Sequence, residues 1–220
     1  MSGPILVVNP NSNPAVTEGL SEALAPFRFA GGPVIECLTL AGGPFGIESA
    51  RDAAEAVPPL LRLVGDRADA AAVIIACFSD PGLAACRAIA RCPVLGIMEA
   101  GVMTALARGD LFGVIAVAEG SIPRHRAAFR QMGVLGRLAS ERAAGLTVAD
   151  SASEAAFARL RSTGEALVAD GADSVILGCA GMARHRTALE AALGRPVVEP
   201  TQAAVAMALG AVLAGQGRPA

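Results

Sequence analysis

The chain has 220 residues and a formal net charge of −2 at pH 7, and 53% of its residues are hydrophobic. This composition supports a folded core, and the nearly balanced charge provides no strong field for nucleic acid or an anionic membrane. All 18 basic residues are Arg, so the chain lacks the Lys that pyridoxal phosphate enzymes and phosphate-binding P-loops require.

Two further features bear on partners and location. Aromatic residues make up only 3% of the chain, which disfavours stacking on single-stranded nucleic acid. The start, Met1-Ser2-Gly3-Pro4, lacks the pattern of a secretion signal, and the longest apolar run, Ala203–Ala214, is shorter than the roughly 20 residues of a membrane span. We therefore expect a cytoplasmic protein without nucleic-acid or membrane partners.

Short apolar runs alternate with helical stretches along the chain, which is typical of a parallel α/β sheet. In chain order, we predict strands at Ile5–Val8, Val34–Leu40, Ala72–Ala76, Val94–Ile97, Phe112–Val117, Leu135–Ala139, Ser174–Leu177 and Val197–Val198. Helices are expected between them, including Glu99–Ala107 and Thr201–Ala214.

The two halves of this pattern match each other. In each half the third strand ends in a cysteine, Cys77 or Cys179, and a Pro-Val strand and an Ala-rich helix follow. The sequence therefore predicts two similar Rossmann-like (β/α)4 parallel-sheet domains related by pseudo-twofold symmetry, with the active site between them. Ligands of open α/β sheets bind beyond the carboxyl ends of the strands, so we expect the two cysteines to face each other across one cleft.

The residues after each cysteine suggest how the thiols are tuned. Asp80 or Ser79 is expected to cap a helix that has Pro81 in its first turn, and Cys179 is followed by a small-residue turn into a helix. Helix N-termini carry free N–H groups and a partial positive charge. They predict thiol pKa values below the reference of about 8.5 and stabilisation of an oxyanion on a bound carbonyl.

A facing thiolate and thiol can racemise a carbon next to a carbonyl, because one removes the Cα proton and the other returns a proton on the opposite face. The alternative for each cysteine is a buried packing residue, which is our interpretation of Cys37, Cys86 and Cys92. The odd number of cysteines predicts free thiols, and no Cys-x-x-Cys spacing indicates a metal site. We predict catalytic Cys77 and Cys179, with no metal and no cofactor.

Candidate substrate-binding residues lie in the loops around these strand ends. They are Asn9, Asn11, Ser12, Phe78, Ser79, Gly178, Ala180, Gly181 and Glu199. The three in the Asn-rich loop can bind an amide or carboxylate, and a plain turn is the alternative. Thr201 is expected to cap the last helix, and Glu199 to reach the cleft. The two histidines, His125 and His185, each lie between arginines, and we interpret both as solvated helix positions.

These motifs resemble those of the aspartate/glutamate/hydantoin racemase superfamily, and most closely its hydantoin and allantoin racemase branch. Val8-Asn9-Pro10-Asn11-Ser12 is similar to the start of that branch. Ala76-Cys77-Phe78-Ser79-Asp80-Pro81-Gly82 and Leu177-Gly178-Cys179-Ala180-Gly181-Met182 resemble its two cysteine motifs. Weaker matches are Ile47-Glu48-Ser49 and Pro196-Val197-Val198-Glu199.

The resemblance implies two similar α/β domains, with the cysteines as opposed acid and base and a final helix that returns to the first domain. We accordingly expect a first domain of residues 1–98 plus 205–220, which contains Cys77, and a second of residues 99–204, which contains Cys179. A homo-oligomer is also implied. Ser79 departs from the Gly that many family members have there, and the loop Gly42–Gly46 matches no one substrate.

Three functions remain open on the sequence. The first is a cofactor-independent racemase of a 5-substituted hydantoin or allantoin-like ureide. The second is an aspartate/glutamate-type amino-acid racemase, whose substrate has a less acidic Cα proton and two charged groups. The third is a non-catalytic α/β domain that binds a small ligand, which the duplicated cysteine disfavours. The two cysteines also argue against a decarboxylase of the superfamily, which uses one.

Overall fold

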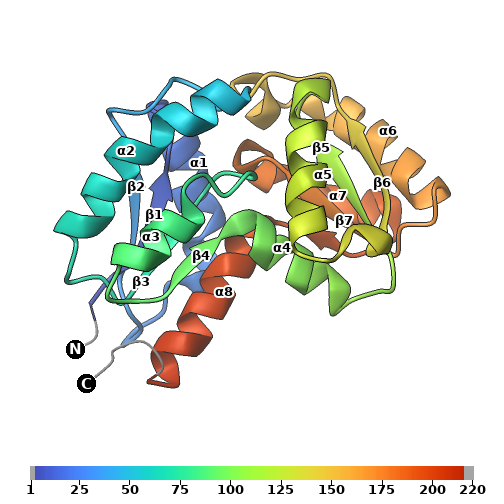
Figure 1. Ribbon diagram of the computed structural model, residues 1–220. Helices are drawn as coiled ribbons and strands as arrows, with labels where there is room; N and C mark the ends of the chain where they lie inside the picture. Colours follow the sequence, from blue (N-terminus) through green and yellow to red (C-terminus); the bar gives the residue numbers. More distant parts are fainter. Residues whose placement is uncertain (1–2, 216–220) are drawn as a thin grey trace.

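In the computed structural model, which describes residues 3–215, strands and helices alternate and build two four-stranded parallel sheets (Figure 1). The predicted α/β fold with two parallel sheets is therefore confirmed. Residues 1–2 and 216–220 of the expected first domain lie outside the described residues.

The first half of the chain forms the sheet with strand order β2-β1-β3-β4. Its strands are β1 (Ile5–Asn9), β2 (Ile35–Thr39), β3 (Ala72–Ile75) and β4 (Val94–Gly96), and the helices among them are α1 (Pro14–Ala23), α2 (Ala50–Asp66), α3 (Leu83–Ile89) and α4 (Ile97–Leu106). Every residue of β1 and β3 is buried. Their apolar runs are continuous because helices cover both faces of a parallel sheet.

The second half repeats this order as β6-β5-β7-β8. Its strands are β5 (Phe112–Ala116), β6 (Leu138–Ala143), β7 (Ser174–Gly178) and β8 (Val197–Val198), and its helices are α5 (Ile122–Gln131), α6 (Ala156–Ala169), α7 (Arg186–Leu193) and α8 (Pro200–Leu213). A 3-10 helix, η5 (Ala180–His185), follows β7. Strand β3 of the first sheet and β7 of the second occupy equivalent positions.

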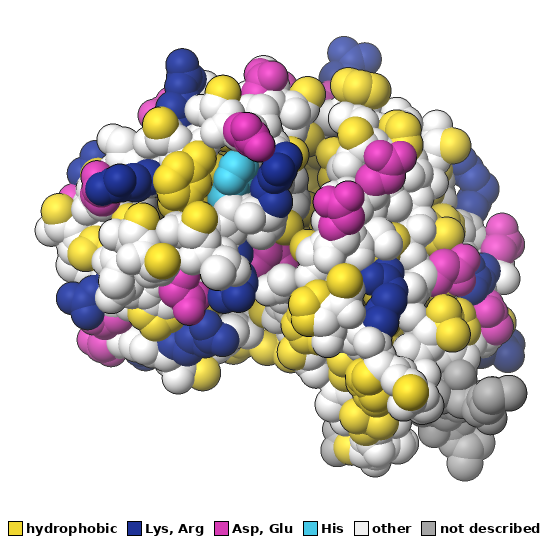
Figure 2. Space-filling model, turned by 180° about the vertical axis from the view of Figure 1, so that it is seen from behind, with side chains coloured by type: hydrophobic (Ala, Val, Ile, Leu, Met, Phe, Trp, Pro, Cys, Tyr) yellow, Lys and Arg dark blue, Asp and Glu magenta, His cyan; other side chains and the backbone are white. Residues whose placement is uncertain are grey.

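The last helix links the two halves. Helix α8 packs along α4 and also contacts β3 of the first sheet and β7 of the second. In Figure 1 it runs in red beside α4 and back toward the first sheet. Figure 2 shows hydrophobic side chains gathered over this projecting end, where Met207 and Leu213 are exposed.

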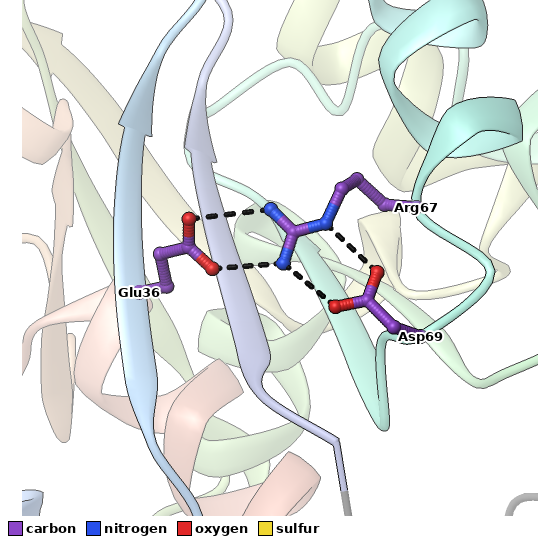
Figure 3. A network of polar contacts seen from close by, with 3 residues as sticks. All are labelled: Glu36, Arg67 and Asp69. Carbon is purple, nitrogen blue, oxygen red and sulfur yellow. Dashed lines mark hydrogen bonds and ion pairs between the residues drawn. The ribbon is translucent and has the colours of Figure 1, made fainter.

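An Arg-centred network fixes the edge of the first sheet. Arg67, at the end of α2, donates two hydrogen bonds of 3.2 and 2.8 Å to the Glu36 carboxylate on β2 (Figure 3). The same guanidinium donates bonds of 2.8 and 3.0 Å to Asp69. This fork geometry suits Arg, and it ties the α2 end to the edge strand.

Four local expectations are wrong. Strand β6 begins at Leu138, because residues 135–137 form a 3-10 turn. The helix after Cys77 begins only at Leu83, with Gly82 as its N-cap at a φ of 68°. Thr201 does not cap the last helix, because the Glu199 side chain does so. Both histidines are buried, since His125 is only 2% and His185 6% exposed.

Candidate active site

Cys77 and Cys179 line one cavity between the two sheets, together with residues of both halves of the chain. Cys77 lies two residues after the end of β3, and Cys179 directly follows β7. The two thiols therefore reach the cavity from equivalent strand ends, at the carboxyl edge where ligands of α/β sheets bind.

Each thiol has a serine hydroxyl beside it. The Ser79 hydroxyl oxygen lies 3.3 Å from the sulfur of Cys77, and the Ser151 hydroxyl oxygen lies 3.7 Å from the sulfur of Cys179. The backbone N–H of Gly181 also lowers the pKa of the Cys179 thiol. These contacts provide the polar surroundings that a thiolate needs in a largely buried site.

Burial dominates the acidity of both thiols. It raises the pKa of Cys77 to about 11, although the Ser79 hydroxyl and the charge of Arg124 act in the opposite direction. Burial also raises the pKa of Cys179, and the carboxylates of Glu48 and Glu199 raise it further. The expectation of lowered thiol pKa values is therefore wrong. Around Cys77 no helix N-terminus opposes the effect of burial, because a turn follows this residue.

Asp80 caps α4 and not the helix that follows Cys77, which the sequence predicted it to cap. Its carboxylate accepts hydrogen bonds of 3.0 Å from the backbone N–H groups of Met98 and Glu99, so it caps the start of α4. Asp80 itself has a φ of 44°, an uncommon conformation for a residue other than Gly. This long-range cap holds the turn after Cys77 against α4.

Six of the predicted binding residues line the cavity: Asn11, Phe78, Ser79, Gly178, Ala180 and Gly181. Two of them approach their neighbours too closely for a side chain. A Cβ on Gly178 would lie 2.5 Å from the carbonyl oxygen of Ile115, and one on Gly181 would lie 2.2 Å from the Ser151 hydroxyl oxygen. The small residues around Cys179 therefore allow the backbone to pack closely beside the thiol.

The other three predicted binding residues do not line this cavity. Asn9 is fully buried and donates to the side chain of Asn11, at 3.0 Å, and to the carbonyl oxygen of Asn13. The backbone N–H of Ser12 donates to the carbonyl oxygen of Pro44. Glu199 accepts from the first N–H groups of α8. Asn9 thus shapes the loop that presents Asn11, whereas Glu199 is committed to capping a helix.

The sequence reasoning missed one wall of the cavity. Ser121, Arg124 and His125, from the start of α5, line it beside the thiols. Nδ1 of His125 lies 2.6 Å from a carboxylate oxygen of Glu141 on β6, and the two side chains are 2% and 0% exposed. The flanking arginines suggested that His125 lies on a solvated helix face. Its burial becomes evident only from its contact with Glu141, which lies on a strand that is distant in sequence.

Two loops from opposite halves close over the cavity. Ile47 and Val148 both line it, and a carboxylate oxygen of Glu48 accepts a 3.0 Å hydrogen bond from the backbone N–H of Val148. Glu48 belongs to one of the weaker sequence motifs, although its contact with the second half had no sequence signal. The bond joins the two halves next to residues that line the cavity.

Neither a metal site nor a membrane span is found in the part of the chain that the structure describes. No group of three or more His, Cys, Asp or Glu side chains within residues 3–215 is placed to hold a metal ion. Over the same residues, no helix has both the length and the apolar character needed to cross a membrane.

The chain is similar to known proteins over most of its length. The family described as Asp/Glu/Hydantoin racemase matches residues 5–208. A hydantoin racemase from Paenarthrobacter aurescens is 36% identical over 222 residues, which cover 96% of this chain and 92% of that protein. A hydantoin racemase from Rhizobium meliloti is 33% identical, over 93% of this chain and 86% of that protein.

Solved structures agree with these relatives. An allantoin racemase from Klebsiella pneumoniae superposes with a TM-score of 0.92 and 30% identity, over 99% of this chain and 91% of that one. A glutamate racemase from Francisella tularensis, at 18% identity and a TM-score of 0.70, shares the fold over 98% of this chain and 82% of that one. The chain therefore belongs to the Asp/Glu/hydantoin racemase family, where it groups with the hydantoin racemases.

Proposed function

We propose that the protein racemises a 5-substituted hydantoin or an allantoin-like ureide without a cofactor, with Cys77 and Cys179 as opposed acid and base. The observation that carries this proposal is their convergence on one cavity from equivalent ends of β3 and β7. The cavity belongs to a chain whose relatives include hydantoin racemases. This placement matches the symmetry of the reaction, in which the two enantiomers differ only in the face that carries the proton.

Both protonation states are needed at once. One sulfur acts as a thiolate and takes the Cα proton, while the C–H electron pair moves into the ring and places charge on the carbonyl oxygen. The opposite thiol then returns its proton to the other face. The raised thiol pKa values favour this division of roles, because the second sulfur stays protonated when the first has lost its proton.

The cavity wall favours a ring without formal charge over a free amino acid. Its described lining contains Arg124 and His125 but neither an Asp nor a Glu side chain. The ammonium group of aspartate or glutamate would thus be buried without a carboxylate partner, which is costly. A hydantoin has no ammonium group, and its Cα proton lies beside a carbonyl and is more acidic.

The experiment is polarimetry on a panel of a 5-alkylhydantoin, allantoin, aspartate and glutamate, after exhaustive dialysis against a chelator and with no added cofactor. We expect the optical rotation of at least one hydantoin or ureide to decay well above its spontaneous rate, with no change for either amino acid. Racemisation of aspartate or glutamate alone would favour the amino-acid racemase. Binding of a hydantoin without any racemisation would favour a ligand-binding domain, and activity restored only by a metal would contradict the cofactor-independent mechanism.

A further inference from the structure

The enolate of this reaction needs a hydrogen-bond donor at its oxygen. The sequence predicts that helix N-termini after the two cysteines provide it, but the structure has none directly after Cys77. No helix N-terminus follows Cys77 directly, since the next helix begins six residues later at Leu83 and is short. The polar groups that line the cavity must therefore supply part of this stabilisation. Donors placed where charge develops contribute strongly to catalysis because a closed site excludes water.

The side chains of His125 and Glu141 form a buried titratable pair at the cavity, which the acid and base steps leave unused. The imidazole lines the cavity, and its ring lies edge to face with Phe78, with a centroid distance of 5.2 Å. Nδ1 is engaged by Glu141 at 2.6 Å, whereas Nε2 has no hydrogen-bond partner within residues 3–215. The free ring nitrogen therefore belongs to a residue of the cavity wall.

The surroundings of the pair also need an explanation. The second carboxylate oxygen of Glu141 and Nε of Arg124 are both buried without a hydrogen-bond partner among the described residues. A buried carboxylate on an edge strand costs free energy unless a positive charge compensates it. A histidine ring that carries protons on both nitrogens would balance the Glu141 charge, and its Nε2 would be a donor.

We propose that His125 is a catalytic residue of the racemisation, which donates a hydrogen bond from Nε2 to the substrate carbonyl oxygen that becomes the enolate oxygen. Glu141 is its positioning residue, because it holds Nδ1 and balances the charge. The His125 proton stays on nitrogen: the thiolate takes the Cα proton, the oxygen gains charge, and the opposite thiol reprotonates the carbon as the carbonyl re-forms. The proposal rests on the proposed function, because it concerns the same cavity and substrate.

A matched pair of substitutions separates the two ring nitrogens. The amide nitrogen of Gln reaches the place of Nε2, and that of Asn reaches the place of Nδ1. His125→Gln therefore keeps a donor toward the substrate, whereas His125→Asn keeps only the bond to Glu141. The control is His185→Gln, since His185 is also buried and flanked by arginines but does not line the cavity.

The readout is exchange of the Cα proton of each enantiomer of a 5-alkylhydantoin in deuterium oxide, together with kcat and KM. We expect His125→Asn to slow exchange of both enantiomers by a similar factor, roughly 10²- to 10³-fold, mainly in kcat. His125→Gln should retain at least tenfold more activity than His125→Asn, and His185→Gln should match the wild type. If His125 has a purely structural role, His125→Asn should be more active than His125→Gln. That result would overturn the proposal, as would an effect on KM alone.

A second measurement does not depend on how much of a variant is folded. A 5-phenylhydantoin spreads its enolate charge into the aromatic ring, so it depends less on a donor at the oxygen. The ratio of the phenyl rate to the alkyl rate should rise at least tenfold in His125→Asn relative to the wild type. An unchanged ratio overturns the role of His125 even if the variant is unstable.

The outcomes also separate this inference from the proposed function. Cysteine variants should affect the two enantiomers differently, whereas a residue at the enolate oxygen affects both alike. If the cysteine variants affect the two enantiomers differently and His125→Asn keeps the wild-type kcat, only the role proposed for His125 is wrong. If the wild-type protein racemises no hydantoin or ureide, both proposals fail.

Discussion

The hydroxyl of Ser151 lies 3.7 Å from the sulfur of Cys179 and donates its hydrogen to the carbonyl oxygen of Val148, at 2.8 Å. Its contact with Cys179 lowers the pKa of that thiol, against the larger effect of burial. The Ser79 hydroxyl makes no second hydrogen bond within residues 3–215, so it is free to donate to the Cys77 thiolate. Both hydroxyls therefore oppose the effect of burial on the pKa of their cysteines.

Ser79→Ala should make Cys77 a weaker acid. Removal of the donating hydroxyl raises the pKa of the thiol further, so the thiolate fraction at a fixed pH falls. We expect alkylation of Cys77 by iodoacetamide at pH 8 to slow several-fold, as measured by mass spectrometry of the Cys77 peptide. Ser151→Ala is the matched control and should leave this rate nearly unchanged. Equal or faster alkylation in Ser79→Ala would show that the hydroxyl does not stabilise the thiolate.

The rate of racemisation should rise with pH in the neutral to mildly alkaline range. In the proposed mechanism the base is a thiolate. Burial raises the pKa of Cys77 to about 11, so the thiolate fraction below this value increases with each step in pH. For a single ionisation the increase is about tenfold per pH unit. Initial rates between pH 6.5 and 8.5, corrected for spontaneous racemisation, test this. A flat profile over that range would mean that neither thiol titrates as the buried geometry requires.

Asp80→Ala should destabilise the fold through α4. The Asp80 carboxylate accepts from two backbone N–H groups at the start of this helix, and α4 packs along α8. Loss of a side-chain cap costs about 0.5–2 kcal/mol of the free energy of unfolding. Urea denaturation should show this loss, with a smaller one in Asp80→Asn, which keeps one acceptor oxygen. If Asp80→Ala unfolds at the wild-type midpoint, the cap contributes no stability.

The sequence predicted the fold well because its strands are distinctive. Runs such as Ile5–Val8 and Ala72–Ala76 are apolar throughout, as expected of strands covered on both faces, and the repeated cysteine aligned the two halves. Strand β6 was misplaced because it is an edge strand with the polar residues Ser140, Glu141 and Arg142 at its centre. An edge strand with one half-exposed face lacks the apolar run that marks the others.

Sequence patterns predict those parts of the candidate site that come from one short stretch of chain, but not the contacts between distant stretches. Cys77, Cys179 and the small residues beside them follow from strand ends and a motif. The capping of α4 by Asp80 joins residues 18 and 19 apart in the chain, and the His125–Glu141 pair joins a helix to an edge strand. Such contacts depend on how the elements pack, which no local pattern encodes. The raised thiol pKa values likewise could not be predicted, because they result from burial in the folded protein.

The central claim is that each enantiomer has its own cysteine base, and exchange of the Cα proton in deuterium oxide tests it most directly. A serine hydroxyl is not ionised near neutral pH, so it cannot replace the thiolate base. The racemisation rates of Cys77→Ser and Cys179→Ser should therefore each fall by several orders of magnitude. The remaining cysteine can still exchange the proton of its own enantiomer.

We therefore predict that Cys77→Ser exchanges the Cα proton of one enantiomer of the hydantoin with retention, and that Cys179→Ser exchanges that of the other. Cys86→Ser, which removes a buried thiol outside the cavity, should behave as the wild type. Spontaneous exchange is subtracted with a sample that contains no enzyme. If both variants exchange the same enantiomer, or if either racemises at the wild-type rate, Cys77 and Cys179 are not opposed bases.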